Sequence, residues 1–158
     1  MSNYNYTLKT KNKNDMLSCL SYMFWEIDEG KKVEDVEEAN ITIEQKGNEY
    51  IATIEYIDVI IIDLPNLYDG VECMYDYCKE IVLETNACPF KFSFHMSSDH
   101  GDYFHVGECT FDGKTITYFD NASVDCMEPA EASAKAEYKD GNFCNEEKEF
   151  ELEFDDCF

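Results

Sequence analysis

The stretch YFHVGECTFDGKTITYF, residues 103–119, decides the fold because it joins two strand-like segments through the dipeptide Asp112-Gly113. Aromatic, β-branched and threonine residues, which favour strands, are frequent on both flanks. Asp-Gly between two such segments is among the strongest sequence signals for a β-hairpin. The stretch therefore predicts two antiparallel strands, over residues 103–111 and 114–119.

Alternation of apolar and polar residues predicts further strands on both sides of this hairpin. In the same half of the chain they cover residues 90–96, 132–139 and 149–154. In the other half, a second hairpin is predicted over residues 41–57, around Gly47-Asn48. It leads into residues 58–63, which lack alternation, so we expect that strand to be covered on both faces.

Apolar residues at helical spacing predict two helices. The first begins after Asn14, a favourable N-cap, and ends at Gly30, a favourable C-cap; the second spans residues 66–86. We therefore expect an α+β fold in which residues 15–158 form a single domain. It has a mostly antiparallel sheet of about seven strands with two main helices packed on it, and a mildly basic N-terminal arm, residues 1–14, precedes it. No motif covers enough of the chain to indicate a known family.

The charge of the chain is extreme: 35 Asp and Glu stand against 12 Lys, there is no Arg, and the net charge is -23. Affinity for nucleic acid comes largely from neutralised phosphates, and Arg is the best bidentate reader of guanine and phosphate. The composition therefore argues against direct binding to nucleic acid or to an anionic membrane. It favours a basic protein, or metal cations, as the partner. The alternative is an acidic surface that serves only solubility.

The predicted helix at 66–86 carries five carboxylates on the face opposite to its apolar residues. They are Asp69, Glu72, Asp76, Glu80 and Glu84. Lys79 is the one basic residue of this helix, although like charges three or four positions apart repel each other. Such a face repeats negative charge at intervals comparable with a phosphate backbone, so we expect it to bind the partner. The alternative is a solvent-facing stripe in a generally acidic protein.

The acidic outer face of the last predicted strand would extend this partner-binding surface. Its members are Glu149, Glu151 and Glu153. Acidic residues at these positions have a second interpretation, because charge on an edge strand also prevents sheets from pairing edge to edge.

Three histidines in the segment 95–105 are the best candidates for metal ligands. In a hairpin centred on His100, His95 would lie opposite His105, and imidazoles together with Asp99 or Asp102 are suitable ligands for zinc. The spacing matches no established ligand signature, so we expect no metal and no cofactor. A metal- or small-molecule-binding domain built on this hairpin is kept as an alternative.

The sequence contains no P-loop, no dinucleotide-binding fingerprint and no nucleophile elbow. A pair of carboxylates carries little information among 35 acidic residues, so a carboxylate-based hydrolase is only a further alternative. Eight cysteines show no metal-binding spacing, and the first 14 residues contain no apolar leader region. We therefore expect a cytoplasmic protein with reduced thiols that is not an enzyme.

Together these patterns predict an acidic cytosolic inhibitor or immunity-type protein that blocks a basic partner, such as a nuclease, a toxin or another nucleic-acid-handling enzyme. It would cover the surface meant for phosphates and imitate the charge of DNA, and electrostatic steering would speed its association. An immunity protein that neutralises a toxin and a phage or plasmid anti-defence protein look alike at this level. The oligomeric state stays open.

Overall fold

The computed structural model describes residues 3–56, 71–97, 104–123 and 130–150. Its strands are β1 (Asn3–Thr10), β2 (Ala39–Lys46), β3 (Glu49–Tyr56), β4 (Phe90–Ser97), β5 (Phe104–Phe111), β6 (Thr115–Ser123), β7 (Ala130–Lys139) and β8 (Asn142–Phe150). Its helices are α1 (Lys13–Met23), α2 (Trp25–Asp28) and α3 (Val71–Glu84), with a 3-10 turn η1 (Val33–Asp35). The strand expected at 58–63 lies outside the described residues.

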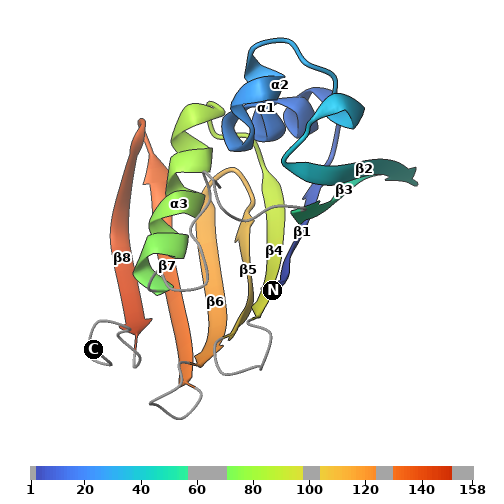
Figure 1. Cartoon of the computed structure of the whole chain (residues 1–158). Coiled ribbons are helices and arrows are strands. Elements are labelled where there is room, and N and C mark those ends of the chain that lie inside the picture. Colours follow the sequence, from blue (N-terminus) through green and yellow to red (C-terminus); the bar gives the residue numbers. More distant parts are fainter. Residues whose placement is uncertain (1–2, 57–70, 98–103, 124–129, 151–158) are drawn as a thin grey trace.

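The eight strands form one antiparallel sheet in the order β2-β3-β1-β4-β5-β6-β7-β8 (Figure 1). From β4 to β8 the chain runs back and forth between neighbouring strands. The predicted hairpins around Gly47 and Asp112-Gly113 are confirmed, and the structure adds a third around Asp140-Gly141, where β8 begins earlier than the strand expected at 149–154. Each of the three glycines has a positive φ. Glycine adopts this backbone conformation without steric cost, which is why it occurs in these tight turns.

β1 lies in the interior of the sheet, between β3 and β4, although its residues belong to the segment interpreted as an N-terminal arm. Tyr4, Tyr6 and Leu8 are buried and alternate with the more exposed Asn5 and Thr7. This alternation is characteristic of a strand with one covered face. The lysines at positions 9, 11 and 13 give the segment its basic character without preventing the strand.

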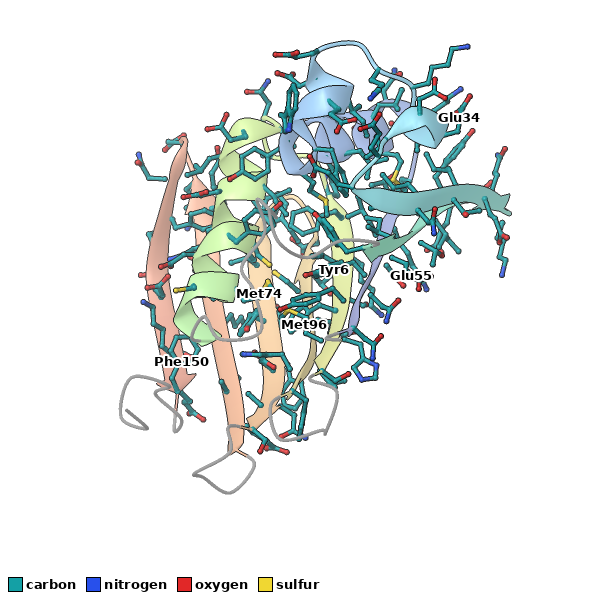
Figure 2. The ribbon with its side chains drawn as sticks, viewed as in Figure 1. Tyr6, Glu34, Glu55, Met74, Met96 and Phe150 are labelled. Atoms are coloured by element: carbon teal, nitrogen blue, oxygen red, sulfur yellow. The ribbon has the colours of Figure 1, made fainter. Side chains whose placement is uncertain are left out.

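The helices lie on one face of the sheet (Figure 1). α1 packs on β1 and β3, and α3 packs on β5 and β6. We call this the covered face and the opposite one the open face. Tyr6, Met74 and Met96 are almost completely buried between the helices and the sheet, whereas Glu34 and Glu55 lie on the outside (Figure 2).

The first helix differs from its prediction at both ends. Asn12, not Asn14, caps it, because the side-chain oxygen of Asn12 accepts a hydrogen bond of 2.8 Å from the backbone amide of Asp15. The helix ends at Met23, since Phe24 adopts an extended backbone (φ -130, ψ 108) and buries its ring against Tyr56. The break starts a separate short helix, α2, where a single helix was expected.

The expectation of an α+β fold with a mostly antiparallel sheet is confirmed, with one strand more than the seven expected and a second, short helix after α1. The apolar face predicted for α3 is buried where the structure describes it. Its members are Met74, Tyr75, Cys78, Ile81 and Val82. Among the described helices, none has the length and apolar character that crossing a bilayer requires.

Candidate functional site

Three carboxylates form an exposed line along α3. Asp76, Glu80 and Glu84 are spaced by one helical turn each, and all three side chains are exposed. Four residues correspond to a rise of about 6 Å along a helix, so the line spans about 12 Å. We call these three residues the acidic stripe.

The one lysine of α3 is turned away from the stripe and towards β8. Lys79 is only 19% exposed, and its Nζ lies 2.8 Å from Oε2 of Glu146 and 3.4 Å from Oδ1 of Asp76. The ammonium group also lies over the ring of Tyr75, 4.4 Å from its centroid. Lys79 therefore serves mainly to bind α3 to β8, and it neutralises only the first member of the stripe.

Glu80 and Glu84 keep their charge exposed. In the described part of the chain no lysine forms an ion pair with either of them. The hydroxyl of Tyr22 in α1 donates a hydrogen bond of 2.5 Å to Oε2 of Glu80. Burial, followed by this hydrogen bond and the charge of Glu80, raises the pKa of Tyr22 well above its usual range, so the tyrosine stays a neutral donor.

Glu146 of β8 forms a small network on the covered face. It accepts hydrogen bonds from the hydroxyl of Tyr75 at 2.9 Å and from Lys79 at 2.8 Å, and Lys148 lies 3.3 Å from it. Burial raises the pKa of Glu146, but these donors outweigh that effect and leave its pKa below the usual range. The carboxylate of Glu146 is thus already neutralised and does not extend the acidic stripe.

Of the remaining residues predicted for the partner-binding surface, the structure places Glu149 apart from the acidic stripe. Glu149 lies on the open face of β8, because its neighbours Lys148 and Phe150 approach the ring of Tyr75 on the covered face. Glu72 lies in the first turn of α3. Asp69, Glu151 and Glu153 lie outside the described residues.

A second acidic region follows α1, and the sequence analysis did not include it among the candidates. Its acidic members are Glu26, Asp28, Glu29, Glu34, Asp35, Glu37 and Glu38. Trp25 in α2 is 53% exposed, and its indole nitrogen donates a hydrogen bond of 3.2 Å to Glu38. The sequence did contain a signal for this region, because acidic residues are dense around a single tryptophan. Tyr22, three residues before Trp25, contacts Glu80, so this region adjoins the acidic stripe.

The middle of the open face is nearly neutral. Among the outward-facing positions of β1, β4, β5 and β6, the described carboxylate is Glu108, and Lys9 and Lys91 lie on the same face. Val106 and Phe119, each 42% exposed, line a hollow of about 380 Å³ there. The negative charge is therefore concentrated on the helices and on the edge of the sheet.

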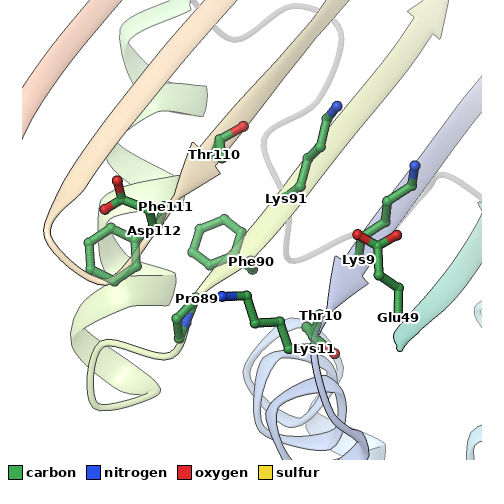
Figure 3. A pocket seen from close by; sticks show the side chains of 10 residues that line it. All are labelled: Lys9, Thr10, Lys11, Glu49, Pro89, Phe90, Lys91, Thr110, Phe111 and Asp112. Carbon is green, nitrogen blue, oxygen red and sulfur yellow. The ribbon is translucent and has the colours of Figure 1, made fainter. Parts of the chain in front are cut away.

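Three lysines gather around another hollow, of about 270 Å³, where β1 and β4 reach one end of the sheet (Figure 3). Lys9, Lys11 and Lys91 surround the apolar rings of Pro89 and Phe90. Acidic side chains also line this hollow: they are Glu49 and Asp112. The charges there are mixed, so the hollow is not a strong anion-binding site.

The two described histidines point to opposite faces of the sheet. His95 pairs with Val106, and His105 pairs with Met96, so the expected placement of His95 opposite His105 is wrong. A shift of one residue in strand pairing exchanges the two faces. His100 lies outside the described residues, and within them no three His, Cys, Asp or Glu side chains gather as a metal ion requires.

His105 belongs to a buried polar cluster on the covered face. Its Nδ1 lies 2.8 Å from Oδ2 of Asp120, and the hydroxyl of Tyr118 donates a hydrogen bond of 2.9 Å to the same oxygen. His105 and Asp120 are 1% and 0% exposed. Burial, followed by the charge of Asp120, raises the pKa of Tyr118 well above its usual range. This cluster could not be predicted while the strand was expected to end at residue 119, whereas Asp120 lies in β6.

Comparison of the chain with known protein families, with curated proteins and with solved structures found no match.

Proposed function

We propose that the protein is an acidic inhibitor. It binds a basic protein that handles nucleic acid, such as a nuclease or a toxin, and covers the surface that this partner uses for phosphates. The observation that carries the proposal is the acidic stripe, which is exposed and which Lys79 does not neutralise at Glu80 or Glu84. An ordinary solvent-facing helix mixes charges of both signs, because pairs of opposite charge stabilise it.

The segregation of charge supports the same proposal. The acids of α2, η1 and α3 lie on the helical side, whereas the middle of the open face is nearly neutral. The electrostatic field of clustered carboxylates steers a positively charged partner and raises its association rate, most strongly at low salt. We therefore place the contact on the helical side of the molecule.

Charge alone supplies rate and specificity more than affinity, so the contact also needs an apolar anchor. Trp25 fits this role because it is 53% exposed in an acidic surrounding. An indole ring also attracts the guanidinium and ammonium groups of a basic partner through its π face. In this arrangement the acidic stripe meets the phosphate-binding residues of the partner, and Trp25 packs against its surface. Neutralisation of a toxin and anti-defence activity, both in the cytoplasm, would use this same contact.

The test begins with the immobilised full chain and an extract of the cells that produce it. Proteins that elute in a salt gradient are identified, and the purified partner is assayed for nucleic-acid cleavage or binding with and without the inhibitor. The expected result is a basic protein that elutes as salt rises and whose activity falls at a fixed stoichiometry. If no basic protein is retained even at low salt, the proposal is wrong.

Charge reversal then locates the contact. Asp76→Lys with Glu80→Lys should weaken binding by about tenfold or more, since it places like charges against the partner. The matched control, Glu44→Lys with Glu55→Lys, changes the net charge equally at exposed positions of β2 and β3 and should change Kd far less. If the two double variants changed Kd equally, binding would depend only on the net charge of the protein. Loss of binding in Phe119→Ala would move the contact to the open face.

A further inference from the structure

Two buried thiols lie next to each other where α1 meets the chain between α3 and β4. The sulfur atoms of Cys19 and Cys88 are 3.9 Å apart, although 69 positions separate the residues in sequence. Cys19 is completely buried, and Cys88 is 7% exposed. A disulfide needs sulfur atoms about 2.05 Å apart, so the two sulfur atoms must move closer together for a bond to form.

The end of α3 holds Cys88 in this position. The amide of Thr85 donates to the carbonyl of Ile81, and that of Ala87 donates to the carbonyl of Val82 at 2.9 Å. Asn86 and Ala87 both have positive φ values, 55 and 61, which turn the chain back towards α1. The sulfur of Cys88 then lies 3.7 Å from the backbone oxygen of Asp15. The pairing of the two thiols is therefore fixed by the backbone on both sides.

The chemistry of the pair is asymmetric. The sulfur atoms of Cys19 and Cys88 share a hydrogen bond in which either can be the donor. This contact lowers the pKa of Cys88, although burial and Asp15 oppose the change. The same interaction, together with burial, raises the pKa of Cys19. Cys88 is also the more accessible of the two, at 7% exposed against 0% for Cys19, so we assign it as the nucleophile and Cys19 as the residue that resolves it.

A polar hollow of about 510 Å³ lies between α1 and the end of α3, beside the chain segments that carry the pair, and neither cysteine lines it. It is lined by Ser18, the neighbour of Cys19, and by Asn86, which lies two residues before Cys88. Glu84 also lines it, and the whole chain carries a net charge of -23. Anionic disulfides are repelled from this region, whereas a small neutral peroxide is not.

We propose that Cys19 and Cys88 form a peroxide-reactive dithiol site that closes to an intramolecular disulfide. The sulfur of Cys88 attacks one oxygen of hydrogen peroxide; a sulfur–oxygen bond forms, the oxygen–oxygen bond breaks, and hydroxide leaves. The sulfur of Cys19 then attacks the sulfenic acid of Cys88, and the hydroxyl group leaves as water with the proton of Cys19. In total the two thiols lose two protons and two electrons, and one peroxide becomes two water molecules.

A second pair of cysteines in the core provides an internal control. Cys78 of α3 and Cys109 of β5 are both completely buried. Burial, followed by a hydrogen bond with Cys78, raises the pKa of Cys109 well above its usual range. Both members of this pair are 0% exposed, whereas Cys88 is 7% exposed, so we expect the pair to resist the peroxide that oxidises Cys19 and Cys88.

The experiment uses the reduced full chain and hydrogen peroxide. After oxidation, the remaining thiols are alkylated under denaturing conditions and the chain is cleaved after lysine. Cys19 then lies in residues 14–31, Cys88 in 80–91, Cys78 in 47–79 and Cys109 in 92–114. The expected product joins 14–31 to 80–91 with the loss of two hydrogens, and dithiothreitol reverses it. Because the link closes a long loop, Tm should rise by roughly 5–10 °C.

Variants separate the site from general oxidation. Cys88→Ser and Cys19→Ser should each abolish the link between the two peptides, whereas Cys78→Ser should keep it. The proposal is overturned if Cys19 and Cys88 are recovered alkylated while the exposed Cys73 is oxidised. It is equally overturned if Cys88 is linked to a different cysteine, or if it is found only as the sulfinic or sulfonic acid.

Discussion

His95 and His105 lie on the two strands of one hairpin, yet their surroundings differ completely. His95 is exposed on the open face of β4, whereas His105 is 1% exposed and bound to Asp120 on the covered face of β5. The same contrast runs through the sheet. The covered face of the sheet holds aromatic rings and one buried polar cluster, and the middle of the open face holds Thr, Ser, Asn and a few scattered charges.

The contrast shows that strand register decides the role of a residue in this fold more than its chemical type does. Moving the pairing of β4 and β5 by one residue would exchange His105 with a solvent-facing neighbour. The contrast between the two faces also explains where negative charge can gather. The sheet has one face filled by the core and the other nearly neutral in its middle, so the negative regions lie on α2, η1 and α3 and at the edges of the sheet.

The largest expected effect comes from the same substitution on the two faces. His105→Ala removes one of the two hydrogen-bond partners of the buried Asp120 side chain and leaves a cavity, so it should lower the free energy of unfolding by about 3–5 kcal/mol. His95→Ala removes an exposed side chain and should change it by no more than about 0.5 kcal/mol. Urea unfolding followed by circular dichroism measures both. Similar losses for the two variants would contradict the contrast between the faces.

Gly107 and Val106 test the contrast between adjacent residues of β5. A Cβ at Gly107 would collide with the backbone of Phe119 and Asp120 and with the ring of Phe94, which lies 2.8 Å from its ideal position. Gly107→Ala should therefore lower the free energy of unfolding by about 2–3 kcal/mol, because the backbone of β6 cannot give way. Val106→Ala, on the open face, should cost about 0.5 kcal/mol. A Gly107→Ala variant as stable as the parent protein would show that the strands separate easily here.

The smallest expected effect is on the pH dependence of stability. Its test compares Glu146 with its neighbour Glu147. The pKa of Glu146 lies below that of an unfolded glutamate, so its contribution to stability is present above the unfolded pKa and is lost as pH falls through the folded one. Glu146→Gln should reduce the acid-induced loss of stability by about 1 kcal/mol or less, since the group is partly exposed. Unfolding curves between neutral and acidic pH measure this difference.

Glu147→Gln is the matched control, because Glu147 is exposed and faces the open side opposite Lys135. It should leave the pH profile nearly as in the parent protein. If both variants change the profile equally, the network around Tyr75 and Lys79 does not hold the Glu146 carboxylate in its ionised form.

Patterns with a short period were sufficient to predict most of the fold. The alternation in residues 90–96 and the dipeptide Asp112-Gly113 predicted β4, β5 and β6, and the apolar face of α3 lies where helical spacing placed it. β1 was missed because the basic character of residues 1–14 was given more weight than the alternation of Tyr4, Tyr6 and Leu8. Its position between β3 and β4 depends on long-range pairing, which local patterns do not contain.

The candidate site was less predictable. The spacing of Asp76, Glu80 and Glu84 predicted an exposed stripe, and the structure confirms their exposure. The sequence could not show that Lys79 turns towards Glu146, or that Glu149 faces the other side of β8. These facts depend on which strand pairs with which and on how α3 is oriented. The predicted pairing of His95 with His105 was wrong for a related reason, since the register of β4 against β5 is not contained in the local sequence pattern.

The exposed position of Trp25 gives the molecule an optical reporter of its own. It is the only tryptophan among 158 residues, so fluorescence excited beyond the absorption of tyrosine comes from this one ring. The ring is 53% exposed and its indole nitrogen donates to Glu38, which gives red-shifted emission that a cationic quencher can reach. A partner bound over the helical side would shift the Trp25 emission to the blue and shield the ring from the quencher. A partner bound on the open face would leave the spectrum unchanged.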